Sequence, residues 1–182
     1  MLWDVMVSAP TPPVRDELVD LAERAIRSFV LSRERLPVPD PLPASLRRPA
    51  AVFVSIKSKD RLRGCLGTLH PRHATLAHEV ITSATQAASE DPRFPPIEAD
   101  ELGRLQITVD VLSAFEPCTE ADLDPRRYGV LIESGARRGL LLPDLPGVTS
   151  VEQQVAIARE KAGIPAHAPV SLFRFRVERH TR

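Results

Sequence analysis

Two pairs of short alternating segments, each joined by a polar turn, constrain the fold more than any other feature of the sequence. In residues 51–57 (AVFVSIK) the apolar side chains alternate, and a turn at 58–61 leads directly into residues 62–67 (LRGCLG). Residues 128–133 and 140–142 flank a second, glycine-bearing turn in the same way. Alternation with a period of two is typical of strands, and a short turn joins antiparallel neighbours. The sequence therefore predicts two β-hairpins.

The segments around these hairpins predict a mixture of helices and further strands. Apolar residues recur at the three-and-four spacing of a helix face in three places: 18–30, 76–88 and 151–162. Strict alternation predicts strands at 105–111 and 173–177. Helices and strands are interleaved, yet the hairpins imply antiparallel pairing. The predicted class is therefore α+β rather than a doubly wound α/β fold.

The length and proline distribution predict a single domain with an appended arm. A chain of 182 residues is long enough for one ordinary domain with a sizeable core. Residues 1–13 are apolar, proline-bearing and aperiodic, which favours an extended N-terminal arm, and residues 14–182 are predicted to form the domain. Five prolines between 37 and 49 forbid regular helix there and predict a stiff connecting strap.

Composition excludes several classes of function. Lys+Arg 24 balances Asp+Glu 24, so the net charge is zero, which argues against a nucleic-acid-binding surface. Arg174 and Arg176 near the basic C-terminus are therefore interpreted as a solvated strand face. Two cysteines provide neither a disulfide framework nor a Cys-rich zinc module, so a reducing, cytoplasmic location is expected. The longest apolar runs are too short for a membrane span.

No motif predicts a bound metal or cofactor. His70, His73 and His78, with Glu79, lack the helical spacing of a zinc-binding HExxH pair. The sequence also contains no Walker A loop, GxGxxG loop or GxSxG elbow. We therefore expect neither metal nor cofactor, while the oligomeric state stays open.

The segment around Cys65 is the strongest candidate for chemistry. In a regular strand, Arg63, Cys65 and Gly67 share one face, which would place the thiol beside a guanidinium. A neighbouring cation lowers a thiol pKa and favours the nucleophilic thiolate. Gly64 and Gly67 thin the backbone, so that another chain, ligand or peptide group can come close. The alternative is a small, buried cysteine in a glycine-kinked strand.

A second candidate is the segment Asp91-Pro92-Arg93-Phe94. Its prolines restrict the backbone, and an arginine presented in this way can clamp an anion or a carboxylate. The alternative is a helix-terminating turn, in which Arg93 pairs with Glu90 or Asp91 and Phe94 fills the core. The residue types alone favour the second interpretation.

With these segments in place, the chain resembles the AMMECR domain family, whose prokaryotic members are called AmmeMemoRadiSam system protein A. The matching segments follow the family's order: 62–68 (LRGCLGT), 91–96 (DPRFPP), 105–113 (LQITVDVLS), 139–143 (GLLLP) and 161–163 (KAG). The resemblance implies an α+β fold with a mainly antiparallel sheet, packed helices, and a larger lobe beside a smaller one. Residues 166–171 depart from it, because they lack a tryptophan that many relatives carry there.

The resemblance also implies a site and partners, but no firmly assigned activity. It implies that the site is lined by the two matching motifs. Within them our hypothesis takes Cys65 as candidate nucleophile, Arg63 and Arg93 as its cationic neighbours, and a binding set of Gly64, Gly67, Thr68, Asp91 and Phe94. The resemblance also implies that genes for a Memo-type protein and a radical-SAM protein frequently occur together with the gene of this family. Two functions follow as hypotheses: an enzyme component with thiol chemistry at Cys65, or a non-catalytic docking module for those partners.

Overall fold

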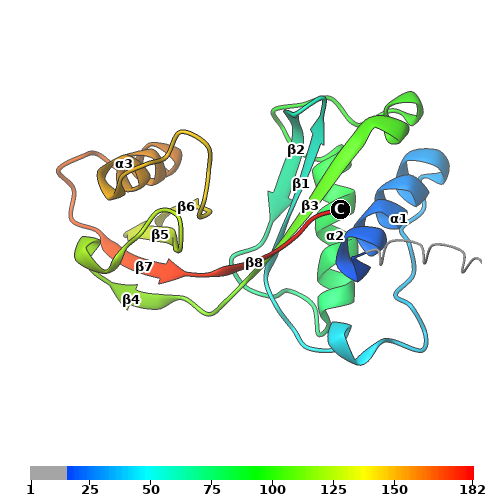
Figure 1. Cartoon of the computed structure of the whole chain (residues 1–182), viewed down its shortest axis with the longest axis horizontal. Coiled ribbons are helices and arrows are strands. Elements are labelled where there is room, and N and C mark those ends of the chain that lie inside the picture. Colours follow the sequence, from blue (N-terminus) through cyan, green and yellow to red (C-terminus); the bar gives the residue numbers. More distant parts are fainter. Residues whose placement is uncertain (1–15) are drawn as a thin grey trace, which may run out of the picture.

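A computed structural model describes residues 16–182, and the expected arm at 1–13 lies outside the described residues. The described chain forms two lobes, each built on a four-stranded antiparallel sheet (Figure 1). The α+β class, the antiparallel pairing and the two lobes are confirmed, with the strands divided between two sheets. None of the helices within residues 16–182 combines the length and the apolar character needed to cross a bilayer.

The larger lobe carries two helices on one face of its sheet (Figure 1). The strand order is β2-β1-β3-β8, so β2 lies at an edge. The elements are α1 (Glu17–Ser32), β1 (Val52–Ser58), β2 (Arg61–Gly67), α2 (Leu76–Ser89), β3 (Leu105–Leu112) and β8 (Val177–His180). Short 3₁₀ helices, η1 (Ala44–Leu46) and η2 (Ala99–Arg104), lie in the connections.

Local signals in the sequence explain where these helices begin. The carboxylate of Asp16 accepts the N–H groups of Leu18 and Val19 at the start of α1, and the Thr75 hydroxyl accepts the N–H of His78 in α2. The apolar faces of both helices share one core with the fully buried Val52, Val54 and Ile56 of β1, because α2 packs on β1 while α1 packs on α2 and β3. Both predicted helices and the first hairpin are confirmed.

The smaller lobe has the strand order β4-β7-β5-β6, with one helix packed on β5 and β6. Its elements are β4 (Glu116–Cys118), η3 (Glu120–Asp122), β5 (Gly129–Ser134), β6 (Arg137–Leu141), α3 (Val151–Ala162) and β7 (Ser171–Phe175). The second hairpin, β5–β6, is confirmed. Helix α3 ends where the sequence predicts, because Gly163 takes the left-handed conformation that glycine adopts readily.

The chain passes between the lobes twice, and the two passages lie side by side. Residues 113–115 lead from β3 into β4, and Arg176 leads from β7 back into β8. The N–H of Ser113 donates to the carbonyl of Arg176 at 2.9 Å, and the N–H of Arg176 donates to the Ser113 hydroxyl at 2.9 Å. The prediction of one closing strand at 173–177 is therefore wrong, because the chain changes sheets at Arg176.

A shared hydrophobic cluster joins the lobes. Ala51 and Leu112 of the larger lobe pack with Leu131, Leu140 and Phe175 of the smaller one. Phe175 is 1% exposed. Its ring lies against Gly129, where any side chain would begin only 2.2 Å from a ring atom. The lobes are therefore fixed to each other by packing as well as by the two chain passages.

Candidate functional site

The pairing of β1 with β2 is irregular next to the candidate cysteine. Ile56 pairs with Gly64, but Lys57 pairs with Leu62, so Arg63 is the extra residue in β2. Such an irregularity breaks the alternation of side chains along a strand. The prediction that Arg63 and Cys65 share one face, with the guanidinium beside the thiol, is therefore wrong.

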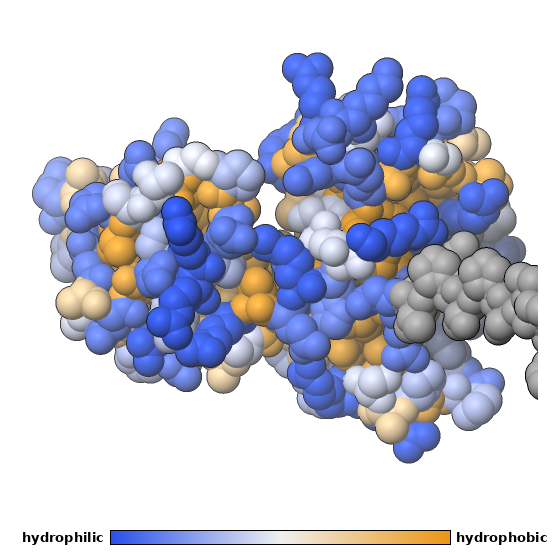
Figure 2. Space-filling model, viewed as in Figure 1, coloured by the Kyte–Doolittle hydropathy of each residue, from blue (hydrophilic) through white to orange (hydrophobic). Residues whose placement is uncertain are grey.

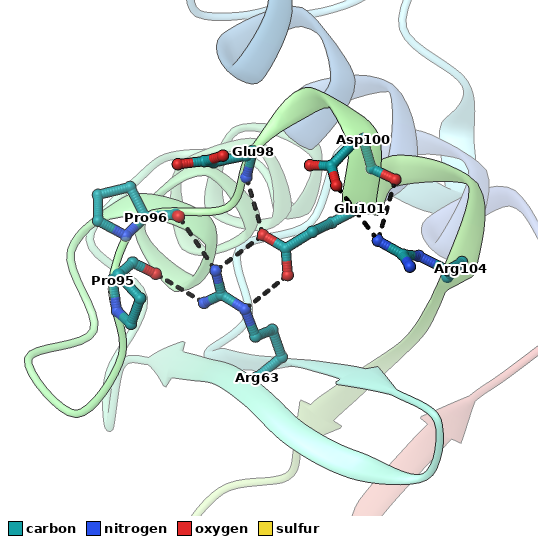
Figure 3. A network of polar contacts seen from close by, with 7 residues as sticks. All are labelled: Arg63, Pro95, Pro96, Glu98, Asp100, Glu101 and Arg104. Atoms are coloured by element: carbon teal, nitrogen blue, oxygen red, sulfur yellow. Dashed lines mark hydrogen bonds and ion pairs between the residues drawn. The ribbon is translucent and has the colours of Figure 1, made fainter.

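Arg63 instead binds the segment that follows α2 (Figure 3). Its guanidinium is paired with Glu101 of η2, at 2.8 Å from Nε to Oε1 and 2.9 Å from Nη2 to Oε2. It also donates to the carbonyls of Pro95 and Pro96, at 2.6 Å and 3.0 Å. The Arg63 side chain is only 16% exposed. These contacts hold residues 95–101 against the edge strand.

Asp91 and Arg93 bind the main chain of the edge strand β2 at Cys65. The Asp91 carboxylate accepts the N–H of Cys65 at 2.8 Å, and Arg93 donates to the Cys65 carbonyl at 3.3 Å. Arg93 also donates to Asp91 from Nε at 2.9 Å and from Nη2 at 2.7 Å. The hydrogen bond from Arg93 is the main reason that the pKa of Asp91 falls to about 2. Of the two interpretations of this segment, the structure has the turn in which Arg93 pairs with Asp91.

The Cys65 thiol lies half-buried next to Ser55 of β1. The Ser55 hydroxyl donates to the Cys65 sulfur at 3.2 Å. Burial raises the pKa of the Cys65 thiol above its ordinary value, and this effect outweighs the opposing influence of Ser55, Arg93 and Lys161. Of the two interpretations, the raised pKa agrees with the buried cysteine, whose thiol is protonated at neutral pH, rather than with a thiolate stabilised by a neighbouring guanidinium.

Lys161 of α3 joins the site from the smaller lobe. Its ammonium donates to the carbonyl of Leu140 at 2.9 Å, and its charge acts on both Cys65 and Arg93. Burial is the main cause of a lowered Lys161 pKa. Sequence reasoning left Lys161 out of the site, although it begins the KAG segment that carries part of the family resemblance. Strand and helix periodicity do not indicate that the end of α3 comes near β2.

The two glycines of the motif are explained by close packing of main chains. A side chain at Gly64 would begin 2.1 Å from the Ala87 carbonyl oxygen of α2, and one at Gly67 would begin 2.2 Å from that of Val52. Glycine at these positions lets helix α2 and strand β1 approach β2 directly.

Thr68 and Phe94, which the resemblance assigned to binding, also make internal contacts. The Thr68 hydroxyl is buried and donates to the carboxylate of Glu79 in α2 at 2.7 Å. The Phe94 ring is half-buried, with the Arg93 guanidinium carbon 5.4 Å from its centroid. Of the residues predicted for the site, the structure thus brings together Cys65, Asp91, Arg93 and Phe94 and directs Arg63 and Thr68 elsewhere.

The histidines do not form a metal centre. His73 and His78 stack face to face, with ring centroids 3.8 Å apart, and His70 packs edge-on against Phe115. Within residues 16–182, the structure contains no cluster of three or more His, Cys, Asp or Glu side chains that could hold a metal ion. The chemistry available near Cys65 is that of a thiol with a raised pKa, on which the charges of Arg93 and Lys161 act from different lobes.

Comparisons with known proteins agree with the architecture. The AMMECR1 family model matches residues 19–180. A protein of Thermotoga maritima is 44% identical over 89% of this chain and 95% of its own length. A longer protein of Clostridium acetobutylicum is 40% identical over 91% of this chain but only 36% of its own length. The crystal structure of an uncharacterised protein from Pyrococcus horikoshii superposes with a TM-score of 0.83, at 29% identity, covering 89% of this chain and 88% of that one. The chain belongs to the AMMECR1 family.

Proposed function

We propose that this protein is a cytoplasmic component of a modification system associated with a Memo-type and a radical-SAM protein, and that it contributes a binding surface at the junction of its lobes. The observation that carries the proposal is Arg93, which donates to the carbonyl of Cys65 and stays half-exposed above the buried Asp91, together with Lys161, whose charge acts on Cys65. Fixed cations beside a neutral group suit the recognition of a carboxylate or another anionic group. The family resemblance suggests a Memo-type protein and a radical-SAM protein as the partners that present it.

The local geometry supports binding at Arg93 in particular. Its side chain is 56% exposed, while the carboxylate of Asp91 beneath it is 2% exposed. The buried carboxylate therefore fixes the guanidinium and leaves part of it accessible. A guanidinium held in place loses little conformational entropy when it binds a partner. Exposure at the surface together with a fixed orientation favours docking over a purely structural role.

Co-purification with the two partners from the same genome tests this proposal. Arg93→Ala and Lys161→Ala are expected to weaken capture of a purified Memo-type or radical-SAM protein, whereas Cys65→Ser leaves it unchanged. Arg61→Ala is the matched control, because Arg61 is an exposed arginine at the start of the same strand. Loss of capture in Cys65→Ser with full capture in Arg93→Ala would reverse the assignment.

A specific observation also supports thiol chemistry as a second candidate. The Ser55 hydrogen bond and the charges of Arg93 and Lys161 all favour the thiolate of Cys65, although burial outweighs them in the free protein. A partner that brings further positive charge would lower the Cys65 pKa. The pH dependence of alkylation by iodoacetamide, measured in a Cys118→Ser background with the partner protein bound, distinguishes the two functions. If Cys65 only lines a binding surface, the midpoint of the alkylation rate against pH is expected above the ordinary thiol pKa of about 8.5. A midpoint well below that value favours Cys65 as a nucleophile.

A further inference from the structure

A group of arginines surrounds Tyr128 on the smaller lobe and shares no residue with the Cys65 site. The guanidinium carbons of Arg127, Arg174 and Arg176 lie 5.8, 4.9 and 5.1 Å from the centroid of the Tyr128 ring. Arg176 also donates to the Tyr128 phenol oxygen at 3.0 Å. We call these four residues the Tyr128 cluster.

The topology of the smaller lobe explains why these side chains meet. Phe175 pairs with Gly129 and packs in the shared cluster, whereas Arg174 pairs with Val130 on the other face of β7, and Arg176 follows Phe175 in the passage between β7 and β8. Tyr128 and Arg127 directly precede Gly129 and therefore lie beside that pair. In Figure 2, the most hydrophilic surface of the smaller lobe crosses the middle of its face, where β7 runs in Figure 1.

Two of the three guanidiniums have no anionic partner among the residues that the structure describes. Arg174 is paired with Glu116 at 3.1 Å and also donates to the carbonyl of Asp122. Within residues 16–182, no carboxylate lies within ion-pair distance of Arg127 or Arg176. The other acidic groups nearby are bound elsewhere, since the Asp122 carboxylate accepts from Thr119 and the Asp124 carboxylate accepts from the N–H of Arg126.

The Tyr128 cluster therefore presents hydrogen-bond donors that can bind the oxygens of an anionic ligand. Guanidiniums only donate hydrogen bonds, and the Tyr128 hydroxyl, whose oxygen already accepts from Arg176, still has its own hydrogen to donate. The hydrogen bond from Arg176 and the charges of the three arginines lower the pKa of Tyr128, so the surroundings already favour negative charge. Because guanidiniums lie over the Tyr128 ring, the ring is less available for stacking on a nucleic-acid base.

We infer that the Tyr128 cluster binds a phosphate monoester through Arg127, Arg176 and the Tyr128 hydroxyl. Two unpaired positive charges match a group that carries close to two negative charges at neutral pH, and its several oxygens match the several donors. The monoester can belong to a phosphorylated side chain of a protein or to a small phosphorylated molecule, because the recognised group is the same.

Titration calorimetry with O-phosphoserine, in a buffer free of phosphate and sulfate, tests the inference. Arg127→Gln with Arg176→Gln is expected to weaken binding at least about tenfold, because each change removes charge-assisted hydrogen bonds. Arg126→Gln removes one charge from the same turn without a ring contact to Tyr128, and less than about twofold weakening is expected. Tyr128→Phe is expected to weaken binding to an intermediate degree. Equal losses in the Arg126 variant and the double variant would overturn the inference.

Competing ligands and an independent readout complete the test. Absence of O-phosphoserine binding, equal binding of succinate, or tighter binding of an oligothymidylate would each overturn the assignment to a phosphate monoester. Tighter binding of a phosphoserine peptide than of O-phosphoserine supports a protein as its source, and the reverse supports a small molecule. If the double variant does not fold, NMR of the arginine Nε–H groups in the unmodified protein decides. Phosphoserine must shift the signals of Arg127 and Arg176, and unchanged signals would refute the site.

Discussion

Cys65 is tied into the structure chiefly through its main chain. Asp91 accepts its N–H, and Arg93 donates to its carbonyl, whereas the thiol has one polar contact, from Ser55. A change of the Cys65 side chain therefore leaves the hydrogen bonds of the strand edge in place. Replacing Asp91 removes more hydrogen bonds from the strand edge than replacing Cys65, because the Asp91 carboxylate binds both the edge strand and Arg93.

Asp91 gives the protein a defined sensitivity to acid. The pKa of Asp91 is about 2 in the folded protein, against an ordinary value of 3.8. Since the folded value is the lower one, the ionised carboxylate contributes stability above about pH 4, and this is lost as the pH falls through about 2. In Asp91→Asn we expect a free energy of unfolding at neutral pH that is ~1–2 kcal/mol smaller, because Arg93 is partly screened by solvent.

Chemical denaturation between pH 2 and pH 7 checks this expectation. The gap between the unmodified protein and Asp91→Asn must narrow towards pH 2. A gap that stays constant over this range would mean that the ionisation of Asp91 does not stabilise the fold.

The motif residues of β2 and of residues 91–101 act together as a closure of the sheet edge. An edge strand exposes unpaired backbone groups that invite pairing with another chain. In this protein the segment after α2 lies along that edge, held by Asp91 near its start and by Arg63 and Glu101 near its end. Strand β2 and residues 91–101, which lie apart in the sequence, thus together close the edge of the sheet.

Removing the Arg63 contacts should loosen this edge locally. Arg63→Ala leaves two proline carbonyls without their side-chain donor and leaves the Glu101 carboxylate with the N–H of Glu98 but without its guanidinium partner. We expect amide hydrogen exchange in β2 and residues 97–104 to accelerate at least about tenfold, because a hydrogen bond to a charged group contributes ~1.5–3 kcal/mol. Arg61→Ala, at an exposed position two residues earlier in the same strand, is the control. Unchanged exchange in Arg63→Ala would show that the segment is held by packing alone.

The sequence predicted the elements that depend on local patterns of residues. It did not predict the features that depend on contacts between segments distant in the sequence. The helices, both hairpins and the end of α3 follow from periodicity, caps and turns. The extra residue at Arg63 depends on the docking of residues 95–101, which has no local signal. The single strand expected at 173–177 follows the pattern of alternation, but the sheet that each half joins is set by tertiary packing. The approach of Lys161 to the site could not be predicted for the same reason.

At the scale of the whole molecule, the shared cluster around Phe175 couples the two lobes. We expect Phe175→Ala to lower the free energy of unfolding by ~3–5 kcal/mol, the usual range for removing a buried phenylalanine. The loss should destabilise both lobes, because the cluster draws residues from each. Leu31→Ala, at a position that is 57% exposed, is the control and should change stability by less than ~0.5 kcal/mol.

Calorimetric unfolding provides the measurement. One transition that moves to lower temperature in Phe175→Ala supports a single cooperative unit. Two separate transitions in the unmodified protein would contradict the coupling.

The pairing of Leu112 with Val177 has a consequence for how this architecture can change over time. These residues face each other at the ends of β3 and β8, and everything between them forms the smaller lobe and its connections. A tight turn of two residues could join them and convert β3 and β8 into a simple hairpin. The smaller lobe thus has the topology of a cassette inserted at the tip of a hairpin. Gain or loss of that cassette would add or remove Lys161 and the Tyr128 cluster in one step, while β2 and its covering segment stayed behind.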